Sequence, residues 1–254
     1  MLRAMSERPM HTVPGAMAEL QRLYAEGEHA IAEHRLDDAL LAFTRGIAID
    51  DHFRQRYVTM YAQRAFVLQQ LGRHAEALDD YARAIALNEP TTNQAQYHFH
   101  RAMCLEALGD LEGAVAEHGR SIALYPDHPG PYHLRGKLLV DRLGRHAEGI
   151  PDLDRLLSMR EVPEAYQLRA LAKVSTSRHA EAIADAAHAE QLAPGAYNHY
   201  LLAVAYGATG DEARTREHVE ATLALDRSYA AFFGEVDELA RYRGSPWLVR
   251  ALAG

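Results

Sequence analysis

Apolar residues recur at three- and four-residue spacing along most of the chain, which is the pattern of amphipathic helices. Tyr61, Ala65 and Leu68 form one such series, and Tyr166 and Ala170 belong to another. No segment alternates apolar and polar residues in the way that a half-buried strand would. The pattern therefore predicts an all-α protein.

A short motif returns at a nearly constant interval and divides these helices into pairs. Its clearest copies begin at Gly72, Gly144 and Ser177, and each continues with Arg-His-Ala-Glu. The last residues of six copies, three of them looser, lie at positions 39, 77, 114, 149, 182 and 215. The mean interval is about 35 residues, which indicates a repeat architecture. We expect six units of helix, tight turn and helix.

The unit resembles the tetratricopeptide repeat, a helix-turn-helix motif with small residues at fixed positions. In the first helices these small residues are Gly27, Ala65, Ala102, Gly136, Ala170 and Ala203. In the second helices they are Ala39, Ala77, Ala114, Gly149 and Ala182, with aromatic residues Phe43 and Tyr81 in two copies. The resemblance implies a bacterial-type tetratricopeptide repeat protein, folded as a right-handed α-solenoid of stacked helix-turn-helix hairpins.

The resemblance covers about residues 17–227 and sets the expected organisation. Residues 1–16 are expected to form a flexible leader, residues 17–227 the solenoid, and residues 228–254 capping helices anchored by Trp247. A rival interpretation, which stays open, makes Trp247 an aromatic that docks a partner. The fourth repeat carries one extra residue, and the segments around 51–57 and 89–96 are expected to protrude as loops.

A second regularity supports the same register without reference to any family. Four first helices carry an arginine directly before the small residue, and an acid follows 16 or 17 residues later. We expect each pair to join the two helices of one hairpin and to be structural. The pairs are Arg64 with Asp80, Arg101 with Glu117, Arg135 with Asp152, and Arg169 with Asp185.

Composition excludes several classes of protein. The chain has 27 basic and 35 acidic residues and a formal charge of −8, which argues against a nucleic-acid binder or a polybasic membrane surface. No apolar run is long enough to cross a membrane. A single cysteine, Cys104, excludes an internal disulfide. We therefore expect a soluble, cytoplasmic protein.

No arrangement of residues points to catalysis, a cofactor or a metal. Cys104 lies in an apolar helical run with no adjacent cation and is expected to be a buried, inert thiol. The 15 histidines include no two at the spacing that would place both on one helix face as ligands. Phosphate-binding and hydrolase motifs do not occur. The sequence therefore does not support an enzyme.

In tetratricopeptide repeats the first helix of each hairpin lines a concave groove, and this position defines the candidate binding residues. They are Tyr24, Phe66, Gln69, Phe99, Met103, Glu106, His133, Lys137, Gln167, Tyr197 and Tyr200. Lys137 is the only basic one, so the clamp that such proteins use for a chaperone's acidic tail is absent. The apolar and aromatic members suit a helix or an extended apolar segment.

The leading hypothesis is a non-enzymatic scaffold or adaptor that binds a protein partner in this groove. Two alternatives stay open: a regulatory sensor that closes on a small peptide or ligand, and a structural subunit that assembles into a homo-oligomer. It also stays open whether Phe66, Phe99 and Met103 bind a partner or pack between neighbouring repeats. The identity of the partner does not follow from the sequence.

Overall fold

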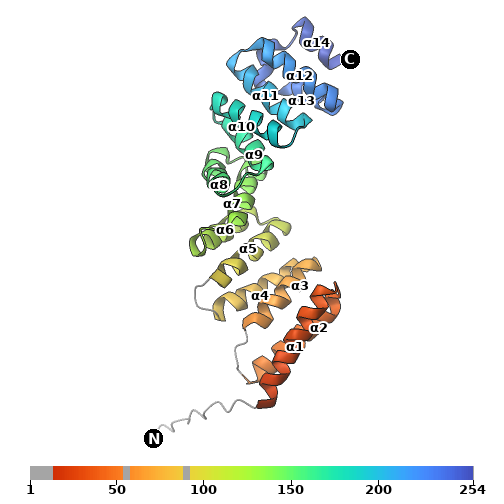
Figure 1. Cartoon of the computed structure of the whole chain (residues 1–254), viewed down its shortest axis with the longest axis vertical. Coiled ribbons are helices and arrows are strands. Elements are labelled where there is room, and N and C mark those ends of the chain that lie inside the picture. The colour runs from red at the N-terminus through yellow and green to blue at the C-terminus, as the bar shows by residue number, and fades with distance from the viewer. Residues whose placement is uncertain (1–13, 54–57, 88–91, 254) are drawn as a thin grey trace. The chain divides into compact units, whose positions relative to one another are not determined.

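A computed structural model describes residues 14–53, 58–87 and 92–253, and in this part of the chain every regular element is helical (Figure 1). The chain divides into two compact units, residues 1–125 and 126–254. Each unit is a series of helical hairpins in which consecutive helices pack against each other. The predicted all-α solenoid of stacked hairpins is confirmed within each unit.

Unit 1 (residues 1–125) contains three helix pairs. The helices are α1 (Pro14–Ala32), α2 (Leu36–Phe53), α3 (Val58–Gln70), α4 (His74–Leu87), α5 (Thr92–Ala107) and α6 (Leu111–Leu124). Besides the pairs, α2 contacts α3 and α4 contacts α5, so each hairpin packs on the next.

Unit 2 (residues 126–254) contains three more pairs and a set of short C-terminal helices. The pairs are formed by α7 (Pro129–Lys137) with α8 (His146–Met159), α9 (Pro163–Ser175) with α10 (His179–Leu192), and α11 (Ala196–Thr209) with α12 (Glu212–Leu225). The C-terminal elements are a 3-10 turn (Arg227–Tyr229), α13 (Ala230–Glu235), a second 3-10 segment (Asp237–Tyr242) and α14 (Pro246–Ala253).

Two expected boundaries differ from the structure. Helix α1 begins at Pro14, inside the expected leader, because proline is tolerated in the first turn of a helix. The segments expected to protrude as loops are partly helical, since α2 extends to Phe53 and α5 begins at Thr92. Ala95, only 2% exposed, gives this part of α5 a buried face. Residues 1–13, 54–57 and 88–91 lie outside the described residues.

The small residues of the repeat allow the helices of one hairpin to approach closely. Ala65, Ala102, Ala170 and Ala203 of the first helices and Ala39, Ala77, Ala114 and Ala182 of the second are fully buried. At Gly27 an added Cβ atom would lie 2.4 Å from the ring of Phe43. A larger residue at this position would force the ring of Phe43 to move.

The turn inside each hairpin ends the first helix with one residue in the left-handed conformation. The backbone φ is positive at His34, Gly72, Gly109, Gly144, Ser177 and Gly210. In five of these turns the next N–H bonds to a carbonyl five residues back, for example from Arg178 to Lys173 at 2.8 Å. This is the bond that closes a Schellman motif.

One of the six turns has serine at the left-handed position, and this residue provides a test of backbone strain. Ser177 has a φ of 60°, a conformation that is unfavourable for a residue with a Cβ atom. Because glycine adopts it freely, we expect Ser177→Gly to raise the free energy of unfolding by about 1 kcal/mol. Urea unfolding followed by circular dichroism would measure the change. Gly144→Ser is the matched control and should lower stability by a similar amount; two changes of the same sign would contradict the explanation.

The extra residue of the fourth repeat is accommodated as a π-helical turn. Residues Leu138–Arg142 continue α7 with this wider geometry. The bond that closes the following turn runs from the N–H of Arg145 to the carbonyl of Leu139, one residue further back than in the other hairpins. The extra residue is thus absorbed where the first helix widens, and Gly144 keeps the left-handed conformation found in the other turns.

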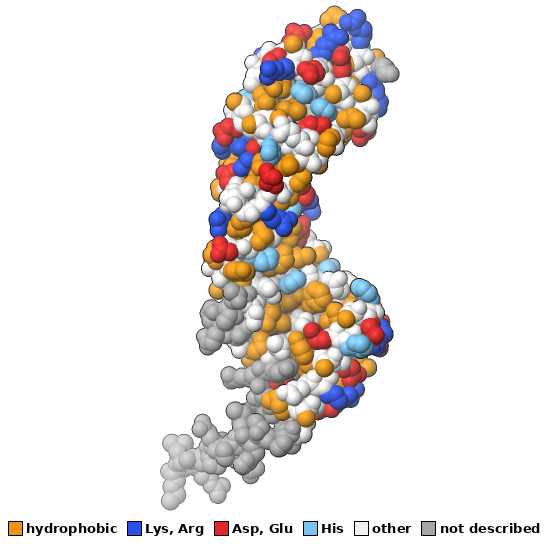
Figure 2. Space-filling model, in the orientation of Figure 1, with side chains coloured by type: hydrophobic (Ala, Val, Ile, Leu, Met, Phe, Trp, Pro, Cys, Tyr) orange, Lys and Arg blue, Asp and Glu red, His pale blue; other side chains and the backbone are white. Residues whose placement is uncertain are grey.

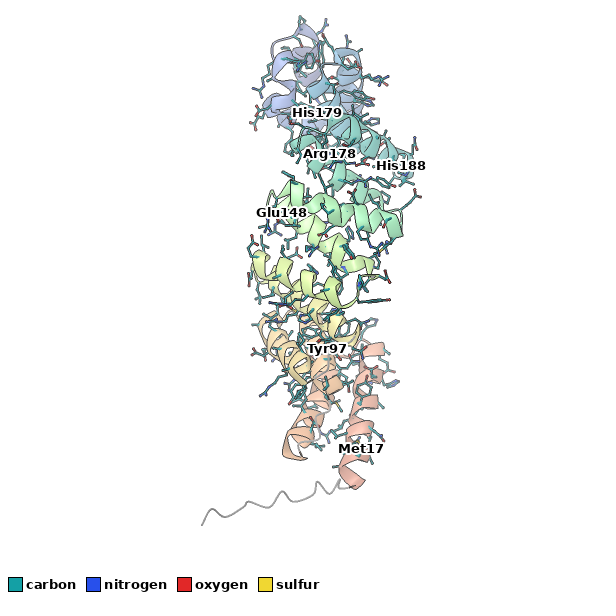
Figure 3. The ribbon with its side chains drawn as sticks, turned by 90° about the vertical axis from the view of Figure 1, so that its left-hand side faces the viewer. Met17, Tyr97, Glu148, Arg178, His179 and His188 are labelled. Carbon is teal, nitrogen blue, oxygen red and sulfur yellow. The ribbon has the colours of Figure 1, made fainter. Side chains whose placement is uncertain are left out.

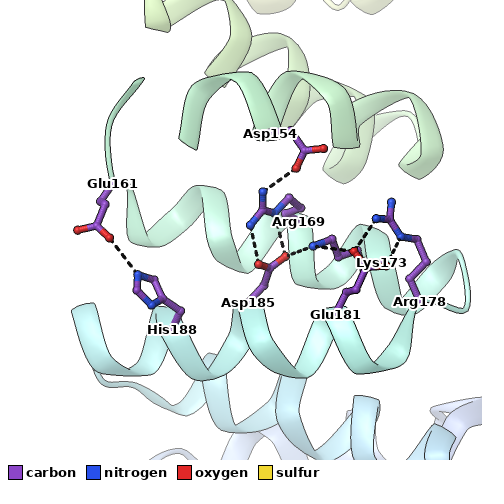
Figure 4. A network of polar contacts seen from close by, with 8 residues as sticks. All are labelled: Asp154, Glu161, Arg169, Lys173, Arg178, Glu181, Asp185 and His188. Atoms are coloured by element: carbon purple, nitrogen blue, oxygen red, sulfur yellow. Dashed lines mark hydrogen bonds and ion pairs between the residues drawn. The ribbon is translucent and has the colours of Figure 1, made fainter. Parts of the chain in front are cut away.

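All four predicted arginine–acid pairs join the two helices of one hairpin. Their hydrogen bonds measure 2.6 to 2.8 Å, and the four acids are only 2% to 5% exposed. Figure 4 shows the pair in α9 and α10, where Arg169 also bonds to Asp154 and Lys173 also bonds to Asp185. These pairs are structural, as expected from their spacing.

The C-terminal helices cover the last hairpin. Trp247 is 7% exposed and packs in one cluster with Ala203 of α11, Val219 of α12 and Phe233 of α13. Its ring also lies 5.7 Å from that of Tyr242. The burial of Trp247 in this cluster supports its interpretation as an anchor and leaves the side chain little surface with which to dock a partner.

Candidate functional site

The eleven candidate groove residues share one property: all are partly buried, neither inside the core nor fully exposed. Six of them, from Tyr24 to Glu106, belong to unit 1, and five, from His133 to Tyr200, belong to unit 2. The two sets are therefore described separately. Such intermediate burial is what side chains on the inner face of stacked hairpins are expected to have.

In unit 1 the structure brings candidate residues together around a pocket of about 240 Å³, here called the aromatic pocket. Five rings line it, from Tyr24 of α1, Phe66 of α3, Tyr81 of α4, and Tyr97 and His100 of α5. Figure 3 shows Tyr97, and Figure 2 shows hydrophobic side chains gathered over α3, α4 and α5 on the face that it draws. First helices from three hairpins thus contribute to one pocket.

The rest of the lining is mostly polar. It consists of Thr59, Ala62, Gln63, Asn93 and Gln96. Asn93 and Gln96 are exposed. Amide side chains of this kind can both donate and accept hydrogen bonds, so they can pair with the main chain of a bound segment.

One acid is held at the edge of the aromatic pocket. The amide nitrogen of Gln63 donates to the carboxylate of Glu28 at 2.6 Å and lies 3.3 Å from the hydroxyl of Tyr24. These contacts join α1 to α3. They fix the carboxylate of Glu28 beside two residues of the pocket lining.

The other candidates of unit 1 are engaged with their neighbours. Gln69 accepts a hydrogen bond from the hydroxyl of Tyr81 at 3.1 Å, and its amide nitrogen lies 3.9 Å from the sulfur of Met103. The ring of Phe99 lies 5.4 Å from that of His100. Phe99 and Met103 therefore make packing contacts within unit 1, whereas Phe66 lines the pocket. Glu106 is outside the pocket lining.

In unit 2 the polar candidates bond to other side chains of the protein. Lys137 donates to Glu164 at 2.5 Å, and His133 lies 3.3 Å from the same carboxylate. The bond from Lys137, opposed by burial, holds the pKa of Glu164 below its usual value. Gln167 donates to the buried Asn198 at 2.7 Å. The single basic candidate of the groove is thus already paired.

Tyr197 and Tyr200 belong to an aromatic contact with the C-terminal helices. Their rings stack at 6.1 Å, and Tyr200 lies 5.3 Å from both Tyr229 and Phe233. Burial, together with the charge of Asp141, raises the pKa of Tyr197 above its ordinary value. Replacing Tyr200 would therefore disturb the packing of the cap as well as any groove function.

Several residues of the two sites were missed by the sequence analysis. Thr59, Gln96 and Glu164 lie six positions before the small residue of their helix, which is the position that identified Tyr197. Applying this position to every repeat would have found them. Tyr97 and Gln63 carry no such signal, because their place in the pocket depends on how adjacent hairpins pack.

The metal-ligating side chains do not assemble into a metal site within the described residues. No group of three or more metal-ligating side chains lies together there. Cys104 is fully buried, and burial raises the pKa of its thiol to about 11, which confirms the expected inert thiol. None of the helices in the described ranges combines the length and the apolar character needed to cross a membrane.

A pair of imidazoles in the last hairpin is expected to make the stability of unit 2 depend on pH. Nδ1 of His199 lies 3.1 Å from Nδ1 of His218, beside Glu190. Burial, followed by the charge of His199 and opposed by Glu217, lowers the pKa of His218. Protonation thus favours the unfolded chain, where the pKa is about 6.5. The stabilising effect is complete above that pH and is lost as the pH falls below it.

We expect the urea concentration at the unfolding midpoint to decrease when the pH is lowered from about 7.5 to about 5.5. The decrease should be smaller in His218→Gln. Glutamine keeps a polar side chain at this position but does not titrate. Unfolding curves at several pH values would measure how steeply the urea midpoint changes with pH in each of the two proteins. Equal slopes for the two proteins would mean that this pair does not control the pH dependence.

Comparison with known proteins identifies the architecture. A family model of the tetratricopeptide repeat matches residues 56–127. The solved structure of YrrB, described as a TPR protein with an unusual peptide-binding site, is 18% identical with a TM-score of 0.66, over 74% of this chain and 94% of that chain. A tetratricopeptide repeat protein from Parabacteroides merdae is 16% identical with a TM-score of 0.65, over 93% of each chain.

A third solved structure, MamA from Desulfovibrio magneticus RS-1, is 20% identical with a TM-score of 0.60, over 67% of this chain and 96% of that chain. No curated protein matches the sequence at a significant level. At these identities the likeness is one of fold.

Proposed function

The chain is a tetratricopeptide repeat protein, and from that premise we propose that it is a non-enzymatic scaffold that binds a segment of a protein partner along its first helices. The observation that carries the proposal is the aromatic pocket of unit 1. Rings from α1, α3, α4 and α5 meet there beside exposed amides. A site with apolar walls and a few polar groups is typical of specific binding.

An extended segment fits this pocket better than a packed helix does. Asn93 and Gln96 offer hydrogen bonds to an exposed main chain, which a helix would have satisfied internally. YrrB, a protein of similar fold, is described as having an unusual peptide-binding site, which supports a peptide as the occupant.

The alternative of a ligand sensor has less support. It depends on polar groove residues being available, yet Lys137 bonds to Glu164 and Gln167 bonds to Asn198, and His133 lies 3.3 Å from the carboxylate of Glu164. A ligand would have to break these bonds. The polar groups of unit 2 therefore act first as contacts between neighbouring hairpins.

Site-specific photo-crosslinking in cells would test the proposal. A photoreactive phenylalanine at Gln96, on the rim of the pocket, should crosslink to a partner, and sequencing the crosslinked peptide would identify the bound segment. The matched control carries the same group at Leu41, which is 59% exposed on the second helix of the first hairpin. Equal crosslinking at both positions, or none at Gln96, would refute the groove as the binding surface.

A further inference from the structure

We propose that the aromatic pocket of unit 1 holds a cationic side chain, arginine or lysine, of the bound segment. This inference rests on the proposed function and adds the chemistry of the partner. The pocket measures about 240 Å³. Sites for drug-sized ligands measure about 300–1,000 Å³, so this pocket is of the size for a single long side chain.

Aromatic rings make up a high proportion of the pocket lining. Tyr24, Phe66, Tyr81, Tyr97 and His100 make up half of it. The ring faces of tyrosine and phenylalanine carry negative electrostatic potential and attract cations, most strongly where water is excluded. Burial, followed by the neighbouring Tyr24, raises the pKa of Tyr97, so the phenol of Tyr97 stays neutral at physiological pH.

The charges in and beside the pocket also favour a cation. Among the described residues, the lining contains no lysine or arginine, and the carboxylate of Glu28 is held beside it by Gln63. A cation in the pocket would therefore meet aromatic rings and no lysine or arginine of this lining, with the carboxylate of Glu28 bonded to the lining residue Gln63. The formal charge of −8 on the chain attracts a basic segment over longer distance.

The non-aromatic residues of the lining fit a cation better than an apolar side chain. A site for leucine or valine would be lined by aliphatic groups, but Ala62 is the only aliphatic residue of the described lining. The other non-aromatic members, Thr59, Gln63, Asn93 and Gln96, are polar. A guanidinium or ammonium group can donate hydrogen bonds to the side-chain oxygens of these residues, which leucine and valine cannot do.

The test uses the full chain labelled with fluorotyrosine and follows its fluorine NMR signals. The probes are the capped amino acids acetyl-arginine methylamide and acetyl-citrulline methylamide, which have nearly the same shape and differ in charge. We expect arginine to shift tyrosine signals at millimolar concentration and to bind about fivefold or more tightly than citrulline. Equal binding of the two, or no shift with either, would overturn the proposal.

Two variants separate the role of charge from a loss of structure. Glu28→Gln keeps a hydrogen-bond acceptor for Gln63 and should weaken arginine binding about threefold to tenfold while leaving citrulline unchanged. Glu26→Gln is the matched control, because Glu26 is on the same helix and pairs with Arg22. An equal effect of both variants would show that the pocket does not use the charge of Glu28.

The outcomes for the two proposals are distinguishable. A partner crosslinked at Gln96 together with no preference for arginine would leave the scaffold function standing and refute the cation site. Arginine binding without any crosslinked partner would leave the cation site standing and refute the groove as the binding surface for a partner. Spermidine binding tightly, with no gain when the arginine is placed within a pentapeptide, would refute the assignment to a protein segment.

Discussion

Replacing Asp185 by alanine is expected to lower the free energy of unfolding by about 3 kcal/mol. Asp185 is 5% exposed and accepts hydrogen bonds from Arg169 at 2.6 and 2.8 Å. Nζ of Lys173 lies 2.8 Å from the same carboxylate. Its removal leaves two cations in a low-dielectric region without their shared counter-charge, which is far more costly than losing an exposed pair (Figure 4).

The size of the effect is limited by the other partners of the two cations. Arg169 keeps its bond to Asp154 at 2.6 Å, and Lys173 lies 3.6 Å from Glu181. For this reason we expect a value near the lower end of the range for broken buried pairs, about 3–5 kcal/mol. Urea unfolding of the purified full chain, followed by circular dichroism, would measure it.

The control is an exposed pair in the same hairpin. Arg178 bonds to Glu181 at 2.6 Å, but both side chains are about half exposed. Arg178→Ala should therefore change stability by less than about 1 kcal/mol. A second variant replaces Arg169, Lys173 and Asp185 together by apolar residues and should recover much of the lost stability. If Asp185→Ala cost no more than Arg178→Ala, the buried pairs would not be structural.

The sequence predicts the hairpins well because their internal geometry repeats. Small residues and the arginine–acid pairs recur at spacings set by one helix, one turn and the next helix. The extra residue between Gly136 and Gly144 was visible in the same way. That it forms a π-helical turn was not, because the sequence does not show where a helix will widen.

Contacts between neighbouring hairpins are less predictable. Lys137 was recognised as the only basic candidate of the groove, but its partner Glu164 comes from the next hairpin and lies 27 positions away. Tyr97 and Gln63 join the aromatic pocket through the same kind of packing. No short-range pattern specifies this packing, since it depends on the shapes of two surfaces rather than on one period.

The second large effect concerns the C-terminal cap: Trp247→Ala is expected to lower the free energy of unfolding by about 3–5 kcal/mol. Trp247 packs with Phe233 of the cap and with Ala203 and Val219, which would otherwise lie at the open end of the last hairpin. Its removal leaves a large cavity and loosens α14 from α12, which it contacts. Open ends of repeat arrays are unstable because their apolar face lacks a neighbour.

Trp247→Phe is the matched control for the size of the ring. Nε1 of Trp247 is buried and has no hydrogen-bond partner in the described part of the chain, so phenylalanine loses contacts but also removes an unsatisfied donor. We expect this variant to cost less than half as much as alanine, measured by urea unfolding under the same conditions. If neither variant changed the unfolding curve, Trp247 would not anchor the cap. A smaller effect of phenylalanine would instead show that the volume of the ring stabilises the last hairpin, which is what a cap over an open apolar face requires.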